Sequence, residues 1–311
     1  MIILYNSNRI NKNRNINLNN KSEITFVIVS LEAIKGIKKC LKNIGDNYKV
    51  VVAENSNNKN IKNEIENNYI NTKCILLGKN YGYGSAANKG ISFVKTKFAF
   101  LINADIEILE HQIKNIENEI NKLNNNFSVV TPFYDDFSDF IKIKYDKFFK
   151  NHKKIYISKD IESVPFIKGS SMLFNLSKFK EKIFDENFFF FFEEIDVCKR
   201  IKLADQNIYL INSVKIKHLG GRGIENKKAS EISRFRNWHY YWSSFYYHKK
   251  HYGFHLSFII HSTKLIKFFF LKYFYKFSNK FESEILDCRF SGLLNSILDK
   301  KSSEGPDFGG R

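Results

Sequence analysis

The chain has 311 residues, 43% hydrophobic and 16% aromatic, so it can bury a sizeable core in one large or two modest domains, which excludes a wholly disordered protein. The formal net charge is +18, from 50 Lys and Arg against 32 Asp and Glu, which leaves nucleic acid, anionic lipid and phosphorylated substrates as classes of partner. The four cysteines lie far apart without a CxxC pair, which argues against a disulfide scaffold or cysteine zinc site and fits a reducing cytosol.

Short apolar runs alternate with helical periodicities from residue 24 onward. Strands are predicted at 24–30, 49–53, 73–77, 97–102 and 127–131. Helices are predicted at 34–44, around Ile61 and Ile65, at 85–95, and at 113–123. This alternation is typical of βαβ units and predicts an α/β fold with a mainly parallel central sheet flanked by helices.

The second half of the chain is less regular. Segment 133–163 shows no clear period, and a buried element is predicted at 164–174. A Phe-rich turn leading into a helix is predicted at 185–203, followed by a strand at 208–216 and a helical region from about 226.

Polar residues follow three of the predicted strands, at the sheet edge where parallel sheets bind ligands. They are Glu54-Asn55-Ser56, the segment from Asn80 to Asn88, and Asn103-Ala104-Asp105. A carboxylate such as Asp105 can hold a divalent cation that neutralises phosphate oxygens. The alternative is a simple strand-ending turn, where Asn and Asp are common.

The segment 82–87 (GYGSAA) fits the G-x-G-x-x-A dinucleotide fingerprint, so an NAD-dependent oxidoreductase has to be weighed. The context argues against it, because the fingerprint belongs at the first strand-to-helix turn and two strands precede this segment. The alternatives are a Gly-rich loop that lets a nucleotide approach the backbone, and a helix-starting turn with small residues for packing.

The strongest local signal is Phe184-Asp185-Glu186, followed by five Phe at 188–192 and by Glu193, Glu194 and Asp196. A carboxylate beside apolar rings and other carboxylates is harder to ionise, which makes it a better base near neutral pH. The alternative interpretation is that these acids simply complement a helix N-terminus.

His218 ends a predicted strand and precedes a glycine-rich segment that carries Arg222. Histidine can ligate a metal, and an arginine can bind a diphosphate through two parallel hydrogen bonds. The alternative is a structural histidine whose hydrogen bonds are satisfied within the fold.

Taken in order, these motifs resemble the family 2 inverting glycosyltransferases with a GT-A fold, especially their bacterial rhamnosyltransferase-like branch. The resemblance covers about residues 24–225 and also includes 169–172 (GSSM) and 193–200 (EEIDVCKR). The chain departs from the family pattern where Glu54 and Glu194 replace a commoner Asp, and where the first strand ends Ser30-Leu31-Glu32 rather than Thr-Tyr-Asn.

The resemblance implies a role for each matched position. Glu194 would be the catalytic base, and Asp105 and His218 would hold Mg²⁺ or Mn²⁺. The donor-binding set would be Glu54, Asn55, Asn80, Gly82, Gly84, Asn88, Asn103 and Arg222. The acceptor side would comprise Gly169, Ser170, Glu193 and Asp196.

The activity implied is a metal-dependent inverting transfer from a nucleoside-diphosphate sugar, such as dTDP-rhamnose or a UDP-sugar, to a glycan or lipid-linked acceptor in bacterial surface-polysaccharide synthesis. The alternatives are the oxidoreductase above and a catalytically inactive protein that binds glycan or nucleotide. No nucleic-acid-binding motif is recognised in the sequence, so no nucleic acid partner is expected.

The sequence divides into a basic Asn-rich segment at 1–22 without the apolar stretch of a signal peptide, a GT-A domain at 23–225, and a basic, aromatic helical region at 226–311. Residues 226–281 hold 11 Lys and Arg and a single acid. Lysines within the apolar stretch 254–277 favour a helix lying in a membrane interface over a spanning helix. We therefore expect a cytoplasmic enzyme, peripheral at the inner face of the membrane; the alternative for this helix is packing or homodimerisation.

Overall fold

The computed structural model describes residues 22–135, 155–219 and 229–306. The basic segment predicted at 1–22 lies outside this part of the chain except for its last residue, and so does Arg222.

Four parallel strands form the first half of a central sheet in the order β3-β2-β1-β4. They are β1 (Ile24–Ser30), β2 (Lys49–Glu54), β3 (Thr72–Leu76) and β4 (Phe98–Asn103). Their runs of β-branched residues suit a pleated, buried surface. The helices between them are α1 (Ile34–Ile44), α2 (Lys59–Asn68) and α3 (Tyr83–Ile91).

The second half of the sheet is mixed. β9 (Ser171–Asn175) runs antiparallel between β4 and β6 (Val129–Tyr134), and β10 (Ile208–His218) pairs parallel with β6. β8 (Ile161–Ser163) and β7 (Ile155–Ser158) form the antiparallel edge of the sheet next to β10. The short strand β5 (Ile106–Glu107) pairs antiparallel with the end of β10. The predicted α/β class is confirmed, with parallel pairing restricted to the first four strands and to β6–β10.

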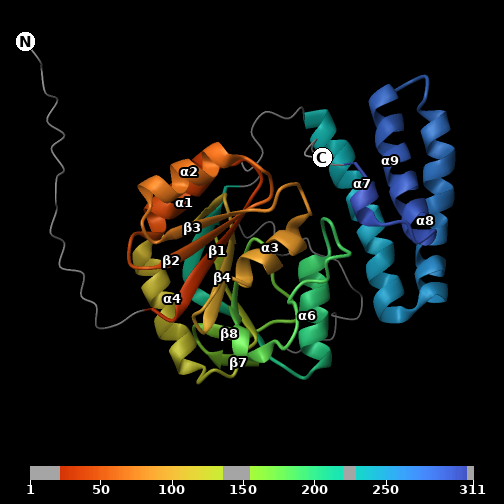
Figure 1. Ribbon diagram of the computed structural model, residues 1–311. Helices are drawn as coiled ribbons and strands as arrows, with labels where there is room; N and C mark the ends of the chain where they lie inside the picture. The colour runs from red at the N-terminus through yellow and green to blue at the C-terminus, as the bar shows by residue number, and fades with distance from the viewer. Residues whose placement is uncertain (1–21, 136–154, 220–228, 307–311) are drawn as a thin grey trace, which may run out of the picture.

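The sheet separates two apolar cores. One face packs against α1, α2 and α4 (Glu110–Lys122), whose buried isoleucines follow the predicted helical spacing. The other face packs against α3 and α6 (Glu193–Leu203). Figure 1 shows these helices on opposite sides of the strands.

Three C-terminal helices pack side by side next to α6 (Figure 1). They are α7 (Ala229–Tyr252), α8 (Phe254–Phe274) and α9 (Lys280–Ile297), followed by a short 3-10 turn, η3 (Ser302–Glu304). The five-Phe run joins this bundle to the sheet domain, since Phe188 and Phe192 form an apolar cluster with Ile195 and Tyr247. The Ser243 hydroxyl donates a hydrogen bond of 2.8 Å to the Phe190 carbonyl. The predicted helical extension is therefore present from residue 229.

One helix start differs from the prediction and another agrees with it. The helix expected at 85–95 runs from Tyr83 to Ile91, because Gly82 already has the extended, positive-φ backbone that precedes it. The helix expected after the Phe-rich turn begins at Glu193, where the acids predict its first turn. Residues before it do not continue the helix, and Phe191 and Phe192 have φ of 68° and 70°.

Candidate active site

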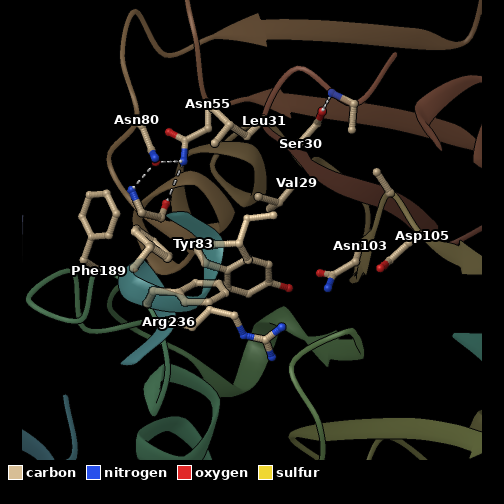
Figure 2. A pocket seen from close by; sticks show the side chains of 16 residues that line it. Val29, Ser30, Leu31, Asn55, Asn80, Tyr83, Asn103, Asp105, Phe189 and Arg236 are labelled. Carbon is tan, nitrogen blue, oxygen red and sulfur yellow. Dashed lines mark hydrogen bonds between the residues drawn. The ribbon is translucent and has the colours of Figure 1, made fainter. Parts of the chain in front are cut away.

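A pocket of about 260 Å³ lies at the carboxyl ends of β1, β2 and β4, the edge at which such a sheet binds ligands. The strand ends contribute Ser30, Asn55, Asn103 and Asp105 to its lining. Figure 2 shows Asn103 and Asp105 together on one side of it, with the Asn55–Asn80 hydrogen bonds on the other. The prediction that polar residues after different strands converge is confirmed for these residues.

Asn55 holds the turn before α3 in place. Its side-chain amide donates to the Asn80 Oδ1 atom at 2.8 Å and to the Gly82 carbonyl at 3.1 Å, while its Oδ1 accepts from the Tyr81 N–H at 2.9 Å. Asn80 Oδ1 also accepts from the Gly82 N–H. The Asn55 amide is used within the protein, so its contribution to a ligand site is to shape the loop that lines the pocket.

Gly82 brings this loop against the Phe run. Its φ of 84° and ψ of 172° fall in a region that is almost exclusive to glycine. A Cβ atom there would lie 2.8 Å from the Phe189 Cα and would collide with its carbonyl oxygen. That carbonyl accepts a 2.9 Å hydrogen bond from the Tyr83 N–H.

We expect Gly82→Ala to lower both the melting temperature and the nucleotide affinity of the protein, since it adds a backbone collision to a strain of about 1–3 kcal/mol. Gly78→Ala is the matched control, because Gly78 has φ of 92° but nothing within 4 Å of an added Cβ. Thermal shift and calorimetric titration of the two variants check this. Equal losses in both would mean that φ strain alone, and not contact with the Phe run, matters.

The Asn103–Asp105 side of the pocket has the properties of a cation site. The His218 Nε2 atom lies 3.3 Å from Asp105 Oδ1, because β10 pairs with β5 and brings residue 218 opposite residue 106. Asp105 Oδ1 and Asn103 Oδ1 are buried without a hydrogen-bond partner among the residues described. An imidazole nitrogen beside orphaned oxygens suits Mn²⁺ or Mg²⁺.

No group of three or more His, Cys, Asp and Glu side chains that could hold a metal occurs in the described part of the chain. Asp105 and His218 would therefore supply only part of a coordination shell. This is typical of Mg²⁺-type sites that are completed by water and substrate phosphates.

The first turn of α6 carries the candidate base. Phe191 and Phe192 hold left-handed backbone angles directly before it, a strained conformation that costs about 1–3 kcal/mol for each residue and is concentrated at functional sites. Glu194 lies against Gly169, where an added Cβ would be 3.3 Å from the Glu194 Cβ. Burial raises the pKa of Glu194 to about 7. Burial, together with the Glu194 charge, raises the pKa of Glu193 well above its ordinary value.

Tyr83 lies between the base and the cation side. Its hydroxyl donates a 2.6 Å hydrogen bond to the Gly169 carbonyl, next to Glu194. Its pKa is raised by burial and further by the charges of Glu193, Glu194 and Asp105, so all three carboxylates lie within electrostatic range of one phenol. Glu194 does not line the pocket itself, but it lies next to Gly169, to which the pocket residue Tyr83 is hydrogen-bonded.

Two predicted donor-binding residues are placed elsewhere. Glu54 is buried, does not line the pocket, and accepts a 3.0 Å hydrogen bond from the Glu32 N–H. Asn88 donates to the Phe184 carbonyl at 2.8 Å and accepts from the Phe184 N–H at 3.0 Å, so it ties α3 to the turn before the Phe run. Neither side chain lines the pocket, and their donor-binding roles stay predictions.

Gly84 and Ser170 support the site without lining the pocket. A Cβ on Gly84 would lie 3.1 Å from the Phe184 Cβ, so close packing requires glycine there. The Ser170 hydroxyl shares a 2.9 Å hydrogen bond with the Tyr134 hydroxyl, and its carbonyl accepts from the Asn103 N–H. Ser170 thus fixes the backbone of the strand end that carries Asn103.

Asp196, predicted on the acceptor side, is fully buried in a charge cluster between α6 and α7. Its carboxylate lies 2.9 Å from Arg200, 2.7 Å from Lys250 and 2.8 Å from His251. Burial alone would raise its pKa, but hydrogen bonds from His251 and Lys250 and the Arg200 charge outweigh burial and lower the pKa to about 2. The Asp196 oxygens are used within the fold, and its acceptor-side role stays a prediction.

We expect Asp196→Asn to destabilise the protein by roughly 3 kcal/mol, near the lower limit for breaking a buried ion pair, because Lys250 keeps Asp185 as a partner. The lowered pKa stabilises the fold above about pH 4, where an unfolded aspartate ionises, and this stabilisation is lost as pH falls toward 2. Chemical denaturation at several pH values checks this. Asp299→Asn, which breaks the more exposed pair with Lys249, is the control; an equal effect of the two substitutions would contradict the prediction.

Sequence reasoning missed the wall of the pocket that comes from the Phe run and α7. Beyond the predicted residues, the lining includes Tyr83, Phe189, Phe190, Ile232, Phe235 and Arg236. Residues 232, 235 and 236 have the i, i+3, i+4 spacing of one helix face. That spacing was a readable signal, but the sequence gives no indication that this face meets the strand ends.

The family profile described as Glycosyl transferase family 2 matches residues 25–182, or 158 of the chain's 311 residues. The chain belongs to glycosyl transferase family 2. This glycosyltransferase is 27% identical over 250 residues to the rhamnosyltransferase WbbL of Escherichia coli (strain K12), an alignment that covers 70% of this chain and 89% of that protein.

Among solved structures, the mannosyltransferase PcManGT from Pyrobaculum calidifontis, in complex with GDP-Man and Mn²⁺, matches this glycosyltransferase with a TM-score of 0.53 at 10% identity. The match covers 91% of this chain and 89% of that one, and it confirms the predicted GT-A fold. The oxidoreductase alternative is set aside, since segment 82–87 opens the third strand-to-helix turn of a glycosyltransferase.

Proposed function

We propose that this glycosyltransferase catalyses a metal-dependent, inverting transfer from a nucleoside-diphosphate sugar to a glycan or lipid-linked acceptor in surface-polysaccharide synthesis. The observation that carries the proposal is the Asp105–His218 pair at the pocket, with a buried carboxylate oxygen that lacks a hydrogen-bond partner among the described residues. The rhamnosyltransferase relative supports dTDP-rhamnose as the first donor to test, and the GDP-Man and Mn²⁺ complex of the structural relative supports Mn²⁺.

The site residues divide the work. Asp105 and His218 would hold Mg²⁺ or Mn²⁺, which when bound neutralises the charge of the departing diphosphate. Glu194, whose pKa of about 7 suits a general base, would take the proton from the acceptor hydroxyl. The hydroxyl oxygen would attack the anomeric carbon on the face opposite the departing diphosphate. The hydrogen bond from the Tyr83 hydroxyl to the Gly169 carbonyl would hold Glu194 at a fixed distance from the Asp105–His218 pair.

A donor-hydrolysis screen across nucleotide sugars, with Mg²⁺ and with Mn²⁺, tests this function. We expect one donor to be consumed in the presence of metal, and the matching nucleoside diphosphate to raise the melting temperature. A wild-type protein that is stabilised by a nucleoside diphosphate but consumes no donor would favour an inactive binding protein. Stabilisation by NAD and not by any nucleoside diphosphate would contradict the proposal.

We further propose that α8 attaches the enzyme to the cytoplasmic membrane face. In the described part of the chain α8 is the one helix long and apolar enough to cross a membrane by length and composition, yet little of it is buried. Its outer face carries an exposed stripe of Ile259, Ile266, Phe270 and Phe274 at helical spacing, and the exposed Phe277 follows just beyond the helix end. Lysines flank it at 264, 267, 272 and 276, which favours an anionic lipid surface over a second copy of this basic chain.

Flotation with anionic and with neutral vesicles at low salt tests this attachment. We expect binding to anionic vesicles, weakened at high salt and by Ile259→Ser combined with Phe270→Ser. Ile70→Ser is the control, because Ile70 is 92% exposed on the sheet domain but lies outside the stripe. Equal binding of all variants, or a dimer in solution that the stripe substitutions dissociate, would contradict membrane attachment and favour homodimerisation.

A further inference from the structure

Arg236 differs from every other basic residue of α7. Arg234 lies 2.8 Å from Glu284, Lys250 lies 2.7 Å from Asp185, and Lys249 pairs with Asp299. Among the described residues, Arg236 has no carboxylate within ion-pair distance, and its Cζ lies 5.8 Å from the centre of the Phe191 ring. Three of four cations on this helix are thus neutralised, and the fourth is directed to the pocket.

The packing of α7 against the Phe run holds Arg236 at the pocket. Ile232 and Phe235 on the same face of α7 line the pocket with it, and Phe235 is buried against Phe189 and Phe190. Figure 2 shows the Arg236 side chain on the α7 side, next to the Tyr83 ring. An arginine stacked on an aromatic ring keeps its planar donor fork in one orientation.

The pocket is therefore lined by a positively charged side chain from α7 and, at the strand ends, by the residues that would hold a metal ion. A ligand that fits both must be anionic and must offer several acceptor oxygens. A guanidinium binds two phosphate oxygens through parallel hydrogen bonds, and it gains strength when negative charge builds up on a leaving group. Apolar rings on the same wall exclude water and strengthen that interaction.

We propose that Arg236 binds the diphosphate of the nucleotide donor, opposite Asp105 and His218. This inference rests on the proposed function. The first turns of α7 then belong to the donor site, and Arg236 stabilises the nucleoside diphosphate as it leaves the sugar.

The test is calorimetric titration of UDP, dTDP and GDP, and of the matching nucleosides, in the presence of Mn²⁺. Arg236→Gln should weaken the binding of the preferred diphosphate roughly 10-fold or more, as expected for hydrogen bonds to a charged group, and leave nucleoside binding within about twofold. Arg236→Lys should retain part of the affinity, since it keeps the charge but loses the bidentate geometry. Arg234→Gln, which removes a paired cation from the same helix, should leave both affinities unchanged.

Equal diphosphate affinity in wild type and Arg236→Gln would overturn the inference while the proposed function stands; weaker binding of a diphosphate-linked lipid acceptor in that variant would then assign Arg236 to the acceptor. A wild-type protein that binds none of the three diphosphates would overturn the donor pocket itself, and the inference with it.

Discussion

Glu194→Gln should lower turnover by roughly 10²–10⁴-fold, the usual contribution of a general base, while nucleotide affinity stays within about twofold. Gln keeps the size of the side chain against Gly169 but cannot accept the acceptor's proton. Single-turnover measurements with saturating donor, together with nucleotide titration, separate these two effects. Glu181→Gln, an exposed carboxylate shortly before the Phe-rich turn, is the control.

The pH dependence of the wild type gives an independent readout of the same residue. A base works only when it is deprotonated, and burial raises the pKa of Glu194 to about 7. The rate should therefore fall as pH drops below about 7, and not near 4.5 as for an exposed glutamate. Full activity of Glu194→Gln, or an acid limb near pH 4.5, would assign the base to another residue.

Asp105→Asn should reduce turnover by roughly 100-fold or more, because Lewis-acid stabilisation of a leaving group is worth several kcal/mol. It should also abolish the stabilisation by nucleoside diphosphate that depends on Mn²⁺. Asn is isosteric but neutral, so the pairing of β5 with β10 should survive. The melting temperature with UDP or dTDP, with and without Mn²⁺, and paramagnetic resonance of bound Mn²⁺ measure this.

Glu107→Gln is the matched control for Asp105→Asn. Glu107 lies two residues further along the same segment and forms a 2.9 Å ion pair with Lys39 on the surface. It should change neither Mn²⁺ binding nor turnover. If Asp105→Asn still binds nucleotide in a Mn²⁺-dependent way, Asp105 is not a metal ligand.

The sequence predicted the features that depend on local pattern. β1 and α1 begin and end at the predicted residues, because an apolar run and a helical spacing of apolar residues depend only on the sequence of each segment. The convergence of Asn55, Asn103 and Asp105 followed from the rule that parallel strands end at one edge.

Contacts between distant segments could not be predicted in this way. Glu54 and Asp196 are acids in the right motifs, but their partners, the Glu32 N–H and the cations of α7, depend on packing that no local pattern contains. Arg236 lies in the basic, aromatic region predicted at 226–311, yet its place in the pocket depends on how α7 packs on the Phe run. Side-chain roles set by tertiary contacts were therefore the part that could not be predicted.

The charge cluster around Asp196 bears on how this protein can be shortened. A fragment ending near residue 225 would retain Arg200 but lose Lys250 and His251, which leaves the buried Asp196 carboxylate without two of its three partners. It would also uncover Phe188 and Phe192, which α7 now shields from water. We expect such a fragment to aggregate on expression rather than to yield a minimal catalytic unit, so crystallisation and ligand screens should start from a chain that extends through η3.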